Sequence, residues 1–164
     1  MVFQGQVLTV EQMLDRAAAT PYTPTGVGAG VRHTAADNAR ACRDLLATGG
    51  SLDDCWRFGI LQTLDDYTST LRRGGVALAA EVFAPQPPLT GSAQVDAAFA
   101  ALAVHLADRD GWDAPAWARD PSRIVAEAWY PAVPVMWHTE ADQDSPPAFR
   151  DRGIFITSRS LARA

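Results

Sequence analysis

The sequence predicts an all-α protein, in which a single helical bundle is followed by a Trp/Pro-rich irregular C-terminal segment with one short β-strand. Apolar residues recur at helical spacing in three long stretches, each opened by a serine or threonine and closed by glycines. Four of the five tryptophans and six of the eleven prolines then fall within residues 112–147, where no such spacing continues. Only residues 153–157, GIFIT, have the composition of a strand, which is too short to form a sheet alone.

The N-terminal part predicts one short helix and a loop. Thr9 and Gln12 have the spacing of a capping box, and the apolar side that follows comprises Val10, Met13, Leu14 and Ala17. Prolines and glycines fill residues 20–34, which predicts a loop or a flexible arm. We therefore divide the chain into an N-terminal helix with its Gly/Pro-rich arm, residues 1–33, and a helical domain, residues 34–164.

Three longer helices are predicted within the helical domain. Thr34, Ser51 and Ser92 each begin one, because a side-chain hydroxyl can accept from the free N–H groups of the first turn. The residues expected to face the core are Ala39, Cys42, Leu45 and Leu46, then Trp56, Ile60, Leu64, Tyr67 and Leu71, and finally Val95, Phe99, Leu102 and Leu106. Glycine pairs predict the ends of the first two helices, and a short helix over 76–83 should follow the second.

The tryptophan-rich segment admits two interpretations, a lid over the bundle or an interaction face. A proline at the start favours a helix over 121–130 that carries Trp129 inward, with Trp117 on the turn before it. Residues 146–153 predict one helical turn, and residues 158–164 predict a return to helix. Tryptophan and arginine are frequent in binding hot spots, so the candidate residues for contact with a partner or ligand are Trp112, Trp137, Arg150 and Arg152.

Composition excludes several classes of protein. The net charge of −5 argues against a general nucleic-acid binder, which needs a basic face. No apolar run approaches the roughly 20 residues of a membrane span, and no leader opens the chain, so we expect a cytoplasmic protein. The spacing of the three histidines, His33, His105 and His138, matches no metal motif, and the sequence contains no nucleophile motif. We therefore expect no metal, no cofactor and no catalytic residue.

One long region resembles a known family. The stretches PPLTGSAQVDAAFAALAVHLADRDGWDAPAWARDPSRIV, WYP and SPPAFRDRGIFITSRSLARA occur in an order that is similar to a helical domain of Xre-type regulators and antitoxin-like proteins of high-GC bacteria. The resemblance spans roughly residues 51–164 and begins with WRFGILQTLDDY. In that family the domain follows a helix-turn-helix domain. Residues 1–50 offer too few helices for one, so we expect no specific DNA binding here.

Three functions remain open from the sequence. The first is a non-enzymatic regulatory or antitoxin-like protein that acts by protein–protein interaction, with a cognate toxin or a second copy of the chain as its partner. The second is a regulator that binds a small molecule in an apolar, tryptophan-lined pocket. An enzyme of unspecified activity is the third.

Overall fold

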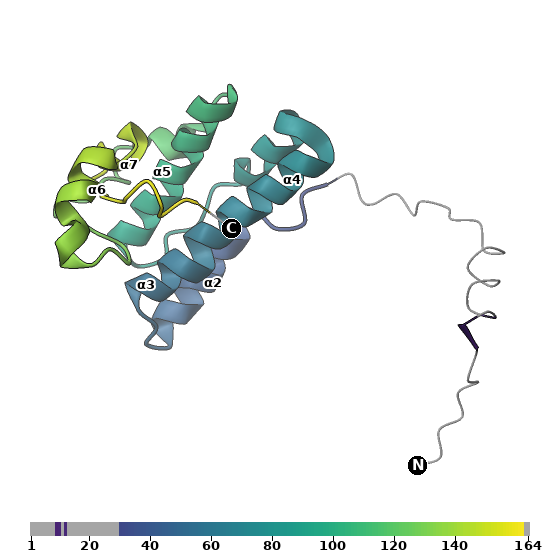
Figure 1. Ribbon diagram of the computed structural model, residues 1–164, viewed down its shortest axis with the longest axis horizontal. Helices are drawn as coiled ribbons and strands as arrows, with labels where there is room; N and C mark the ends of the chain where they lie inside the picture. Colours follow the sequence, from purple (N-terminus) through teal and green to yellow (C-terminus); the bar gives the residue numbers. More distant parts are fainter. Residues whose placement is uncertain (1–8, 11, 13–29, 163–164) are drawn as a thin grey trace, which may run out of the picture.

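The computed structural model describes Thr9, Val10, Gln12 and residues 30–162 (Figure 1). The predicted capping box forms, since the Thr9 N–H donates to Gln12 Oε1 at 3.0 Å and the Gln12 N–H donates to Thr9 Oγ1 at 3.3 Å. The rest of the first predicted helix, with Met13, Leu14 and Ala17, and most of the 20–34 arm lie outside the described residues.

The described part of the chain is mainly helical, as the sequence predicts. In chain order its elements are α2 (Ala35–Ala47), α3 (Leu52–Cys55), the π-helix η1 (Trp56–Ile60), α4 (Leu61–Ala80), the 3₁₀ helix η2 (Glu81–Phe83), α5 (Ala93–Asp110), the 3₁₀ helices η3 (Ala116–Arg119) and η4 (Val135–Trp137), α6 (His138–Asp144) and α7 (Pro147–Arg150). In Figure 1, α6 and α7 lie at the left of the molecule and α4 at the right. None of these helices is long and apolar enough to cross a membrane, over the residues that the structure describes.

The predicted caps position the first helices. Thr34 and Ser51 each accept a hydrogen bond from the backbone N–H three residues on, and the carboxylates of Asp37 and Asp54 accept one from the backbone N–H of the cap residue. The third predicted cap, Ser92, accepts from the Val95 N–H. These sequence predictions are confirmed.

The second predicted helix is continuous but irregular. It changes to π geometry at η1, where Gly59 packs so closely on α2 that an added Cβ would lie 2.2 Å from Cys42 Sγ. A kink at Gly75, whose φ of 76° is not helical, separates this helix from the residues that follow, so the end predicted at Gly74 and Gly75 is confirmed. The predicted stripe packs as expected, with Trp56, Ile60, Leu64 and Tyr67 buried and Leu71 half-buried against the core.

Helix α5 lies at the centre of the fold. It contacts α2, α3, η1 and α4 from one part of the chain, and η3 and α7 from the other. The four predicted core residues, Val95, Phe99, Leu102 and Leu106, are all fully buried. The alanines between them are buried as well, because a methyl group lets neighbouring segments approach on the remaining sides of the helix.

The predicted helix over 121–130 is wrong. Residues 125–129 run beside residues 152–155 instead, where the Val125 N–H donates to Arg152 O at 3.1 Å and the Trp129 N–H donates to Gly153 O at 2.9 Å. These bonds use backbone donors that a helix would need for itself. The buried Arg123 guanidinium also anchors the segment, since it donates to Pro87 O at 2.8 Å.

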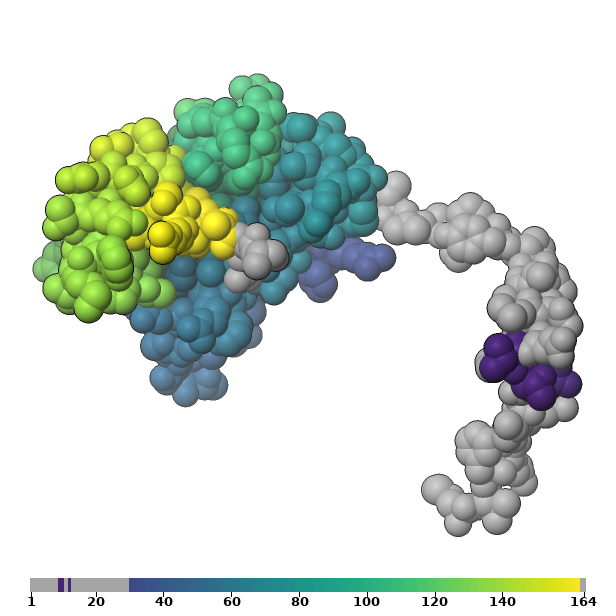
Figure 2. Space-filling view, in the orientation of Figure 1, coloured from purple at the N-terminus to yellow at the C-terminus, as the bar shows by residue number. Residues whose placement is uncertain are grey.

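The C-terminal predictions are confirmed only in part. The helical turn at the prolines forms as α7. The strand predicted over 153–157 is reduced to a single parallel bridge between Trp129 and Ile154. Within residues 30–162 the structure contains no ladder of more than one bridge. The predicted helix over 158–164 is wrong in its described part, where residues 158–161 form a turn. Figure 2 shows these last residues on the surface between the α6–α7 region and the α4 region.

Candidate functional site

The five tryptophans differ in exposure, and the most exposed of them marks the candidate site. Trp56 and Trp117 are buried, with 2% and 7% of their surface exposed, and Trp112 and Trp129 are half-buried. Trp137 is 49% exposed, and the two residues before it, Val135 and Met136, are 82% and 79% exposed. We call Val135, Met136 and Trp137, which make up η4, the Trp137 surface.

The backbone beneath the Trp137 surface is held in place. The Trp137 N–H donates to Pro134 O at 2.8 Å, which closes the 3₁₀ turn. His138 Nε2 lies 3.2 Å from Val133 O, and the imidazole stacks on the Tyr130 ring with their centroids 3.7 Å apart. The Tyr130 hydroxyl in turn donates to Asp142 Oδ1 at 2.8 Å, which also raises the pKa of Tyr130.

The chain before η4 is fixed to α3 as well. Ala132 has a φ of 52°, the left-handed region that is uncommon for residues with a Cβ. Its N–H donates to Asp53 Oδ1 in α3 at 3.0 Å, and this bond joins the tryptophan-rich segment to the start of the second helix. The exposed apolar residues therefore sit on an anchored turn.

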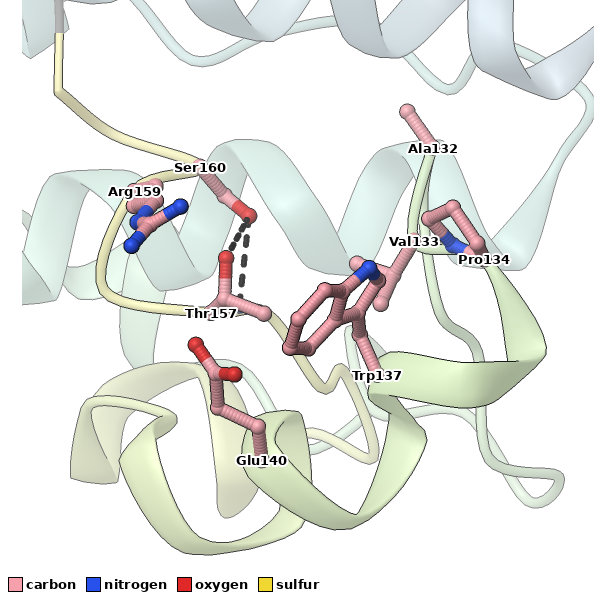
Figure 3. Close-up of a pocket in the computed structure, with 8 residues that line it drawn as sticks. All are labelled: Ala132, Val133, Pro134, Trp137, Glu140, Thr157, Arg159 and Ser160. Carbon is pink, nitrogen blue, oxygen red and sulfur yellow. Dashed lines mark hydrogen bonds between the residues drawn. The ribbon is translucent and has the colours of Figure 1, made fainter.

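A hollow of about 180 Å³ opens beside Trp137 (Figure 3). Its lining residues are Ala132, Val133, Pro134, Trp137, Glu140, Thr157, Arg159 and Ser160. On the far side from Trp137, a turn joins Thr157 to Ser160, since the Thr157 N–H donates to Ser160 Oγ at 3.2 Å and the Ser160 N–H donates to Thr157 O at 2.9 Å. The hollow combines an indole with one carboxylate and one guanidinium.

The other predicted contact residues lie apart from this hollow. Trp112 stacks on Tyr67 and Phe83, and its indole N–H donates to the Tyr67 hydroxyl at 3.0 Å, so most of its surface is used within the fold. Arg150 is exposed at the end of α7. Arg152 points inward, where its guanidinium donates to Ala148 O at 2.9 Å and to Ala118 O, and burial lowers its pKa.

The two tryptophans predicted to face inward behave differently. Trp117 packs inward as predicted, because its indole N–H donates to Phe83 O at 3.0 Å and the Arg123 guanidinium lies over its ring. Trp129 contacts Trp56 edge-on, with ring centroids 6.1 Å apart, and stays half-buried. Both support the lid interpretation for this part of the segment.

The described residues contain no group of three or more His, Cys, Asp and Glu side chains that could hold a metal ion. His105 packs edge-on against Phe149, and burial lowers its pKa. Cys42 and Cys55 are both buried, and burial raises the pKa of the Cys42 thiol to about 12, which suits a structural thiol.

Trp137 is among the contact residues that the sequence predicts, whereas Val135 and Met136 are not. The signal was present, since PVMW places three large apolar residues directly after a proline and before the polar helix HTEADQD. These three residues follow neither a helical nor an alternating spacing, so the sequence pattern does not place them against the core.

Comparison with known proteins adds no relative. The chain matches no family model, no curated protein and no solved structure.

Proposed function

We propose that the protein is a non-enzymatic regulatory protein that binds another protein through the Trp137 surface. The observation that carries this proposal is the exposure of three consecutive large apolar side chains on an anchored turn. Apolar side chains gathered on a surface are typical of sites of association, and tryptophan is frequent among the residues that dominate binding energy.

The size of the hollow supports a protein partner. Small-molecule sites usually enclose about 300–1,000 Å³, and the hollow beside Trp137 encloses about 180 Å³. That space suits one apolar or aromatic side chain of a partner, with Glu140 and Arg159 at its edge for hydrogen bonds. A larger hollow, about 500 Å³ beside Val31 and Leu78, has no tryptophan in its lining, which gives no support to a tryptophan-lined metabolite pocket.

The kind of partner follows from the family resemblance. A similarity to antitoxin-like proteins favours a cognate toxin over a second copy of this chain. In this proposal residues 34–164 act as one helical bundle that presents the Trp137 surface in the cytoplasm, and no duplex DNA is bound because the chain is acidic.

The test is affinity capture in the source organism, followed by binding measurements with the purified partner. Wild type should capture a partner that the double variant Met136→Ser/Trp137→Ser loses. Phe58→Ser is the matched control, because Phe58 is 61% exposed on η1 outside the Trp137 surface. With the purified partner, calorimetry should show affinity reduced at least about a hundredfold in the double variant, the effect of a lost hot spot.

Two outcomes would contradict the proposal. One is a partner that binds the double variant and wild type equally. The other is a wild-type dimer, seen by analytical ultracentrifugation, that the double variant converts to a monomer, because the Trp137 surface would then join two copies of this chain.

A further inference from the structure

Another hollow is lined by two arginines, although the net charge of the protein is −5. It encloses about 200 Å³, and its lining residues are Arg32, His33, Asp66, Ser69, Thr70 and Arg73. It shares no lining residue with the hollow beside Trp137. We call it the Arg32–Arg73 hollow.

Two elements bring these residues together. Asp66, Ser69, Thr70 and Arg73 follow one another at spacings of three, one and three residues, which places them on one face of α4. Arg32 and His33 directly precede Thr34, whose capping box fixes the start of α2. The beginning of α2 thus delivers a guanidinium and an imidazole to the hydroxyl-bearing face of α4.

Neither guanidinium group of this hollow forms an ion pair with another described residue. Within residues 30–162, ion pairs form at Arg40, Arg43 and Arg109, and neither Arg32 nor Arg73 takes part in one. Arg73 donates one hydrogen bond, to Thr70 Oγ1 at 3.2 Å, and Thr70 is 2% exposed, so a buried hydroxyl orients the guanidinium. A guanidinium has five N–H donors, so Arg73 keeps donors for a ligand.

Asp66 adds a carboxylate to the lining of the same hollow. Its Oδ2 accepts from the Asn38 amide and its Oδ1 from the Gln62 amide, at 2.9 Å and 3.2 Å. An ionised carboxylate accepts about four hydrogen bonds, so Asp66 can accept further ones. It repels a fully deprotonated oxyanion and accepts a bond from one that keeps a proton. Inorganic phosphate keeps a proton near neutral pH and a phosphate monoester keeps one below its second pKa of about 6, whereas sulfate keeps none.

We propose that the Arg32–Arg73 hollow binds a protonated phosphate group, either inorganic phosphate or the phosphate of a small monoester. Arg32 and Arg73 donate to its oxygens, as guanidinium groups do at phosphate sites. Ser69 offers a hydroxyl donor, and Asp66 accepts the proton that the phosphate group retains.

The test is an NMR titration of the full chain at about pH 5.5, below the second pKa of about 6 of a phosphate monoester, so that both ligands retain a proton. Inorganic phosphate should shift the amide signals of Ser69, Thr70 and Arg73, and sulfate should bind at least about tenfold more weakly, the effect of one lost hydrogen bond to a charged group. Glycerol phosphate separates the two sources of the ligand, because equal binding indicates a monoester site and much weaker binding indicates a site for the free anion.

Variants test the assigned roles. Arg32→Ala and Arg73→Ala should each weaken phosphate binding about tenfold or more. Arg57→Ala is the control, since it removes the same charge from η1 outside the hollow. Asp66→Asn should let sulfate bind as well as phosphate. The proposal is wrong if phosphate shifts none of these signals, if sulfate binds wild type equally well, or if Arg57→Ala weakens binding as much as Arg73→Ala.

Discussion

Phe99 and Phe58 place the same side chain in opposite surroundings. Phe99 is fully buried in α5, whereas Phe58 is 61% exposed on η1. Phe99→Ala should lower the free energy of unfolding by about 3–5 kcal/mol, because it removes buried apolar surface and leaves a cavity. Phe58→Ala should change it by no more than about 0.5 kcal/mol. Urea denaturation of both variants measures the difference, and equal losses would contradict the burial of Phe99.

The two cysteines should be chemically inert in the folded protein. Cys42 and Cys55 are both buried, and burial raises the pKa of Cys42 to about 12, so its thiolate is scarce at neutral pH. The thiolate is the reactive form, and raising the pH from about 7 to 9 should therefore give little reaction with a thiol reagent such as Ellman's reagent. Both thiols should react promptly in denaturant. Rapid labelling of one thiol in the native protein would show that α2 and α3 open readily.

At the scale of elements, η1 depends on a close contact between helices. Gly59→Ala should lower the free energy of unfolding by about 1–3 kcal/mol, because the added methyl group would overlap Cys42 Sγ. The same change in a Cys42→Ala background should cost less, since the overlapping sulfur is gone. Denaturation of wild type, both single variants and the double variant gives the coupling. If the losses of stability in the two single variants simply add in the double variant, the strain caused by Gly59→Ala does not arise from contact with Cys42.

The elements also show how far the sequence predicts the fold. Thr34, Ser51 and Ser92 were identifiable as caps because capping depends on residues three positions apart. The non-helical conformation of residues 121–130 could not be predicted in this way. Their backbone hydrogen bonds reach Arg152 and Gly153, and no local pattern encodes pairing with a segment so distant in sequence. The sequence also does not predict that α5 is buried on several sides, because alanine is compatible with both core and surface.

The candidate sites divide in the same way. Trp137 was identifiable as a candidate for exposure because a large aromatic side chain without helical spacing has no evident inward face. Arg152 was not identifiable as a structural residue, because its two carbonyl partners, Ala118 and Ala148, come together only in the fold. The Arg32–Arg73 hollow likewise joins residues about forty positions apart.

At the scale of the whole molecule, the net charge predicts a low affinity for duplex DNA. Counterion release on binding duplex DNA requires cationic side chains that neutralise several phosphates, and a net charge of −5 argues against a broad basic face. Fluorescence anisotropy at about 50 mM salt should show at most micromolar binding that does not depend on sequence. A nanomolar complex with one DNA sequence, and not with a scrambled duplex of equal length, would contradict this prediction.

The five tryptophans together report the packing of residues 56–137, because they range from buried to exposed. Trp137 is the most exposed and Trp56 the least, at 49% and 2%. Trp137→Phe should therefore remove the component of fluorescence that acrylamide quenches most and shift the remaining emission to shorter wavelength. Trp117→Phe is the comparison, since it removes an indole that is 7% exposed and should leave the quenchable component in place. If Trp117→Phe, and not Trp137→Phe, abolished the quenchable component, then η3 would be the open face of the tryptophan-rich segment and the Trp137 surface would be covered.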